Sequence, residues 1–89
     1  MVEEIVEITN PTGLHARPAA LFVQTAAKFS SHIWIIKNDR KVNAKSIMGL
    51  MSLAVSRGTK ITVGAEGDDE ELAVKELAVL IAENFYEDI

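Results

Sequence analysis

The chain has 89 residues, a net charge of −4 and no cysteine, which excludes disulfide bonds, thiolate metal sites and thiol catalysis. Hydrophobic residues make up 48% of the chain, enough for a single packed domain over residues 1–89 without covalent cross-links. No apolar run approaches membrane-spanning length, and the first residues, Met1-Val2-Glu3-Glu4, do not form a signal peptide. We therefore expect a cytoplasmic protein without membrane insertion.

Charge is distributed unevenly along the chain. Residues 1–16 carry −3, residues 17–60 carry +7 and residues 61–89 carry −8. The basic middle segment predicts a locally positive surface that suits acidic partners or phosphorylated groups. For Lys37, Arg40 and Lys41, simple solvation is an equally good interpretation.

The first elements follow from hydrophobic periodicity. Residues 2–8 alternate imperfectly between apolar and acidic side chains, which is typical of a half-buried strand. A turn-forming loop follows, and from Ala16 to Lys28 apolar residues recur every three or four positions, as in an amphipathic helix. A neighbouring face of this helix has small or short side chains: Ala16, Ala20, Gln24 and Ala27. Helix propensity explains such a face, and so does the close approach of a partner.

The next segment predicts a hairpin and a short helix. Residues 32–37 and 40–43 are β-rich and flank a tight turn, but both faces of the first strand are apolar, so alternation does not assign its inner face. Ser46 is a good N-cap for a helix over residues 47–53. We expect the outer face of this helix to be a contact surface formed by Ile47, Met48 and Met51. Burial of Met48 in the core is the alternative.

The last segment predicts a strand and a helix. Residues 60–66 alternate cleanly, with Ile61, Val63 and Ala65 facing inward. An acidic run opens the final helix, where Asp68 and Glu71 have the spacing of a capping box. The order of elements predicts an α+β fold, an open-faced β-sandwich with three helices on one face of a four-stranded antiparallel sheet (βαββαβα).

His15 is the candidate reactive residue. It lies directly before the first predicted helix, whose free N–H groups favour anions, and Arg17 adds a cation that can bind a phosphate with two hydrogen bonds. This combination favours phosphoryl transfer to the imidazole. On local chemistry alone, a helix cap or a packing role is the commoner explanation of such a histidine. His32 offers no convincing second ligand, so we expect neither a metal site nor a cofactor.

Two segments resemble a known family. Thr12-Gly13-Leu14-His15-Ala16-Arg17-Pro18-Ala19 resembles the phosphorylation-site signature of HPr, the histidine-containing phosphocarrier protein of the bacterial sugar phosphotransferase system. Lys45-Ser46-Ile47-Met48-Gly49-Leu50-Met51-Ser52-Leu53 resembles the regulatory serine region of that family in Gram-positive bacteria. The similarity covers essentially the whole chain. It implies the same open-faced sandwich, with Ile33 and Ile35 inside and Trp34 and Ile36 on the open face of the sheet.

The resemblance also implies a function. His15 would accept a phosphoryl group from phospho-enzyme I and donate it to enzyme IIA domains, with Arg17 stabilising the phosphate. The protein would then be a stoichiometric carrier rather than an enzyme. Ser46 would be the target of HPr kinase/phosphorylase, and the Ser46-phosphorylated form would serve a catabolite control protein. The expected partner surface comprises Thr12, Ala16, Ala20, Gln24, Ile47, Met48 and Met51.

Two alternatives are compatible with the sequence. One is a paralogue of the same fold in a regulatory or nitrogen-related phosphotransfer chain. The other is a small nucleic-acid-binding domain that uses the basic middle segment and Trp34. The acidic isoelectric point and the single tryptophan argue against direct nucleic-acid binding.

Overall fold

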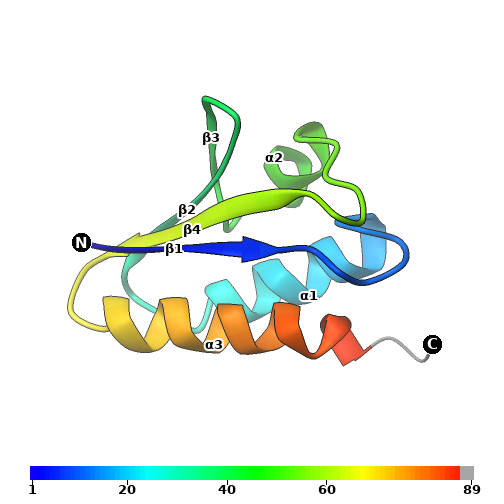
Figure 1. Ribbon diagram of the computed structural model, residues 1–89. Helices are drawn as coiled ribbons and strands as arrows, with labels where there is room; N and C mark the ends of the chain where they lie inside the picture. Colours follow the sequence, from blue (N-terminus) through cyan, green and yellow to red (C-terminus); the bar gives the residue numbers. More distant parts are fainter. Residues whose placement is uncertain (87–89) are drawn as a thin grey trace.

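The computed structural model describes residues 1–86. Its elements follow the predicted order (Figure 1): β1 (Val2–Glu7), α1 (Ala16–Ala26), β2 (His32–Lys37), β3 (Arg40–Asn43), α2 (Ile47–Ser52), β4 (Lys60–Glu66), α3 (Glu70–Ala82) and a closing 3₁₀ turn, η1 (Asn84–Tyr86). The first two helices end one or two residues earlier than expected, a difference confined to their frayed last turns.

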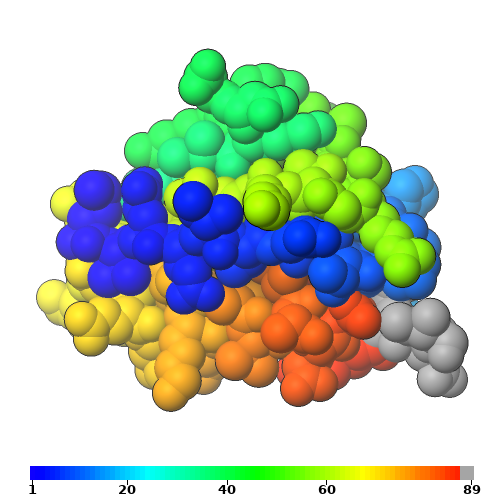
Figure 2. Space-filling model, viewed as in Figure 1, coloured from blue at the N-terminus to red at the C-terminus, as the bar shows by residue number. Residues whose placement is uncertain are grey.

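The four strands form one sheet in the order β1-β4-β2-β3, and every neighbouring pair is antiparallel. Figure 1 shows α1 and α3 side by side beneath the sheet, with α2 packed beside α1 and β3. In the space-filling view, β1 crosses the front of the molecule above α3, so the outer edge of this strand is on the surface (Figure 2). The predicted α+β open-faced sandwich is confirmed.

The inner face of the sheet and the facing sides of the helices form the core. The predicted inward residues of β4, Ile61, Val63 and Ala65, are all buried. Ile33 and Ile35 of β2 are fully buried, which decides the face that alternation left open. Helix residues with no or almost no exposure close the core from below: Phe22, Ala26, Leu77 and Ile81.

Trp34 lies on the open face of the sheet but is only 2% exposed. The ring packs over Gly64 of β4, where a Cβ atom would come within 2.2 Å of the indole Nε1. That Nε1 donates a hydrogen bond to Glu3 Oε2 at 3.1 Å, and Lys41 Nζ lies 4.2 Å from the ring centroid. Neighbouring strands therefore cover the tryptophan. It is not an exposed base-stacking platform of the kind that the nucleic-acid alternative requires.

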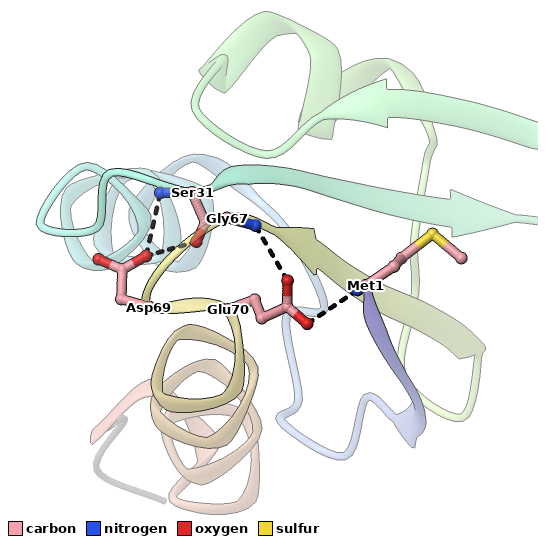
Figure 3. Close-up of polar contacts among 5 residues, drawn as sticks. All are labelled: Met1, Ser31, Gly67, Asp69 and Glu70. Carbon is pink, nitrogen blue, oxygen red and sulfur yellow. Dashed lines mark hydrogen bonds and ion pairs between the residues drawn. The ribbon is translucent and has the colours of Figure 1, made fainter.

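The start of α3 differs from the predicted capping box. Asp68 and Glu71 do not form it; instead, Gly67 N–H donates to Glu70 Oε1 at 3.0 Å, because the turn at Gly67 starts the helix at Glu70. Figure 3 shows that Glu70 also binds the amino group of Met1, at 2.8 Å. Asp69 accepts hydrogen bonds from the N–H groups of Ser30 at 2.9 Å and Ser31 at 3.0 Å, and from the Ser31 hydroxyl. The acidic run thus joins α3 to the starts of β1 and β2.

Acid is expected to weaken the junction between Asp69 and Ser31. The hydrogen bonds from the Ser31 hydroxyl and the Ser30 N–H lower the pKa of Asp69 below its ordinary value of 3.8. A carboxyl group with a lowered folded-state pKa stabilises the fold above its unfolded pKa, and this contribution is lost as pH falls through the folded-state value. Below pH 3.8, the urea midpoint of the wild type should therefore fall more steeply than that of Asp69→Asn.

Asp68→Asn is the matched control, because Asp68 is the exposed neighbouring carboxylate and makes no side-chain hydrogen bond or ion pair within residues 1–86. Its urea midpoint should follow the wild-type dependence on pH. The same dependence in Asp69→Asn would show that the junction does not titrate with Asp69.

Candidate phosphoryl-acceptor site

The loop before α1 is held in place by backbone contacts. Fully buried Asn10 donates from Nδ2 to the carbonyl of Gly13 at 2.8 Å, and Leu14 N–H donates to the carbonyl of Val55 at 3.0 Å. Gly13 has φ 65°, and a Cβ atom there would come within 2.4 Å of the Val55 carbonyl oxygen. A glycine is therefore required where the two loops meet. The contact fixes the backbone that leads into His15.

His15 is exposed and is the N-cap residue of α1, with extended backbone angles of φ −77° and ψ −174°. Its carbonyl accepts from Ala19 N–H at 2.9 Å, but its imidazole makes no capping hydrogen bond. The interpretation of this side chain as a helix cap is therefore wrong. Pro18 has no N–H, so the free donors of this first turn are the N–H groups of Ala16 and Arg17. The helix thus presents two donors and an unengaged imidazole at the surface.

Arg17 is exposed at the second position of α1. Within residues 1–86 its guanidinium makes no side-chain hydrogen bond or ion pair. No acidic residue lies in the first turn of the helix to compete for it. The cation is therefore available to an anion placed on His15.

The predicted partner residues lie on neighbouring elements. Thr12, Ala16 and Gln24 are exposed and Ala20 is half-buried, while Ile47, Met48 and Met51 of α2 are 42%, 83% and 41% exposed. Burial of Met48 in the core is therefore wrong. The two helices that carry six of these residues, α1 and α2, pack against each other. We call this set of seven residues the docking surface.

Ser46 lies at the start of α2, as expected. Its Oγ accepts from Gly49 N–H at 3.1 Å, and its side chain is half-buried. The hydroxyl therefore has a structural role as the N-cap of α2.

Four basic side chains of the middle segment contact other parts of the fold, and the sequence did not predict these contacts. Lys37 and Arg40 hold carbonyls at the end of α2, Lys41 covers Trp34, and Lys45 Nζ donates to the carbonyl of Phe29 at 2.8 Å. No local sequence signal marks these partners, because they lie at least seven residues away along the chain. Neutral carbonyls and an aromatic ring do not cancel these charges, so the contacts fix where the positive charge of the middle segment lies.

One groove of small-molecule size lies away from His15. A groove of about 600 Å³ lies between α1 and α3 and includes Gln24 but not His15. Within residues 1–86, no three His, Cys, Asp or Glu side chains are grouped so that they could hold a metal ion. In the same range, no helix is both long and apolar enough to cross a membrane.

Comparison with known proteins decides the family. The family model for the "PTS HPr component phosphorylation site" matches residues 2–83. This chain belongs to the HPr family. Membership supports a phosphocarrier role in the phosphotransferase system, in which the phosphoryl group is carried as phosphohistidine.

Similar proteins carry two names within the HPr family. The chain is 57% identical over 83 residues to the HPr-like protein Crh of Bacillus subtilis, covering 93% of this chain and 98% of that protein. It is 49% identical over 81 residues to the phosphocarrier protein HPr of Neisseria meningitidis serogroup A, covering 91% of each. A solved HPr structure from Thermoanaerobacter tengcongensis is 63% identical, covers 100% of both chains and superposes with a TM-score of 0.97.

Proposed function

We propose that His15 carries the phosphoryl group, taking it from phospho-enzyme I and passing it to enzyme IIA domains of the sugar phosphotransferase system. The observation that carries this proposal is the exposed, unengaged imidazole at the start of α1, beside Arg17 and two free N–H groups. A carrier must present its nucleophile to two different proteins in turn, so an exposed site suits this role better than a closed pocket. The same role places the protein in the cytoplasm.

In each transfer, one bond to phosphorus forms as another breaks. A neutral imidazole nitrogen attacks in line while the bond between phosphorus and the donor group of enzyme I breaks, and the reverse exchange delivers the group to enzyme IIA. The negative charge on the equatorial oxygens faces the N–H groups of Ala16 and Arg17 and the Arg17 guanidinium. These contacts must hold the phosphoryl group only moderately, since a carrier that binds its cargo too tightly cannot release it.

Incubation with enzyme I and phosphoenolpyruvate tests the proposal. The protein should acquire one phosphate that is labile in acid and stable in base, as expected of phosphohistidine, and should lose it to a IIA domain. No uptake from charged enzyme I, or uptake without onward transfer, would reject the carrier role of this chain.

We further propose that Ser46 is a regulatory site, phosphorylated by HPr kinase/phosphorylase and read by a catabolite control protein. Support comes from its place beside Ile47 and Met48 of the docking surface. A phosphate there adds roughly two negative charges next to apolar side chains, which disfavours docking on an apolar or acidic partner.

Ser46→Asp is therefore expected to slow phosphorylation by enzyme I about tenfold. Ser46→Ala is the matched control: it removes the cap hydrogen bond to Gly49 N–H and should cost about 1 kcal/mol of stability without slowing transfer. Transfer assays quenched at fixed times, at equal protein concentration, measure the rate for each variant. If both variants accept phosphate at the wild-type rate, Ser46 is only a helix cap.

A further inference from the structure

The short helix α2 requires support from elsewhere in the fold. It has six residues, well below the roughly 12 that an isolated helix needs to persist in water. Leu50 is its only buried residue, while Ile47, Met48 and Met51 face solvent. The carbonyls of Leu50 and Met51 accept from the N–H groups that follow the helix, so only the carbonyls from Ser52 onward need donors from elsewhere in the fold. Little of the helix is therefore held by packing.

Two cations of the β2–β3 hairpin bind the end of this helix. Lys37 Nζ donates to the carbonyls of Leu53 at 2.9 Å and Ala54 at 3.0 Å. Arg40 Nη1 donates to the carbonyl of Ser52 at 3.0 Å, and Nη2 lies 3.4 Å from the Ser52 hydroxyl. Positive charge at a helix C-terminus is favourable, and basic side chains satisfy its free carbonyls.

The backbone just after α2 is strained at the point where the hairpin binds. Ala54 has φ 52°, in the left-handed region that residues with a side chain disfavour. The carbonyl of this same alanine accepts from Lys37. The hairpin thus holds the chain in a conformation that Ala54 itself does not favour.

We propose that Lys37 and Arg40 are positioning residues that clamp α2 to the hairpin and so present Ile47, Met48 and Met51 to partner proteins as a pre-ordered face. Figure 1 shows the hairpin beside α2, and β3 contacts this helix. A face that is already ordered in the free protein loses less conformational entropy when a partner binds. The clamp is a property of the free protein, whereas its effect on docking rests on the function proposed above.

Lys37→Met tests the clamp and Lys41→Met is the matched control. Both remove one lysine charge from the hairpin, but Lys41 lies over Trp34 on the open face of the sheet. In Lys37→Met, the amide hydrogens of Gly49 to Leu53 should exchange about tenfold faster, as expected for lost hydrogen bonds from a charged group, while those of β4 stay unchanged. Lys41→Met should leave α2 exchange at the wild-type rate.

Transfer kinetics test the consequence for docking. In Lys37→Met, the KM for this protein as substrate of enzyme I should rise about fivefold with little change in kcat, because docking weakens while His15 is untouched. Lys37→Arg should restore a lower KM by keeping a cation at the same carbonyls.

Three outcomes separate the possibilities. Unchanged α2 exchange in Lys37→Met would overturn the clamp. Faster exchange with an unchanged KM would overturn the claim that pre-ordering serves docking. Failure of the wild type to accept phosphate would reject the proposed function, and the exchange measurement on the free protein would still decide the clamp.

Discussion

His15→Ala is expected to accept no phosphoryl group from charged enzyme I. The imidazole is exposed and makes no capping hydrogen bond, so its removal deletes the nucleophile with little loss of packing. The unfolding midpoint should stay close to that of the wild type, because substitutions of exposed residues without partners change stability by about 0.5 kcal/mol or less. Phosphate uptake and urea unfolding of the same preparation measure the two effects.

His32→Ala is the control for this experiment. His32 is the second histidine of the chain, is also exposed, and lies at the start of β2 with its ring 5.5 Å from that of Trp34. The His32→Ala variant should accept phosphate as the wild type does. Uptake of phosphate by His15→Ala, or its loss in His32→Ala, would show that the acceptor has been assigned to the wrong residue.

Arg17→Ala is expected to slow phosphoryl transfer about 100-fold while leaving the fold intact. The guanidinium has no side-chain partner within residues 1–86, so its loss removes no internal contact but takes away the cation closest along the helix to His15. Arg17→Lys should recover only part of the rate, because an ammonium group cannot make two parallel hydrogen bonds to one phosphate. Single-turnover transfer at saturating enzyme I measures the effect.

Lys28→Ala distinguishes a local effect of the Arg17 charge from a general effect of net positive charge. Lys28 is an exposed cation just past the other end of α1, and its removal changes the net charge by the same amount. A similar loss of rate in Lys28→Ala and Arg17→Ala would point to long-range steering. Equal rates for the Arg17 variants and the wild type would mean that the N–H groups of α1 suffice.

The docking surface comprises seven positions that the sequence predicted. The sequence placed Thr12 in the loop before the first helix and the other six on two helices, and the structure packs these helices together while exposing or half-exposing each residue.

Local patterns were sufficient for the order of the elements. Alternation assigned the inward residues of β4, turn chemistry located the hairpin, and Ser46 was recognised as an N-cap because its partner, Gly49 N–H, is three residues away. The position of His15 before α1 followed from the glycine and proline around it. The resemblance of its flanking residues identified the family. In each case the residues that matter are close together along the chain.

Contacts between residues that are distant along the chain became known only from the packing of the fold. Trp34 is buried because Gly64, 30 residues later, leaves room for its ring, and Asp69 binds Ser31 rather than capping α3 with its side chain. Lys37 and Arg40 donate to carbonyls at the end of α2 because the hairpin folds back beside that helix. No periodicity or spacing encodes such contacts, since they depend on how the sheet brings separate segments together. The sequence therefore predicted the elements, the family and the candidate phosphoryl acceptor, whereas the packing determined which charged side chains bind within the fold.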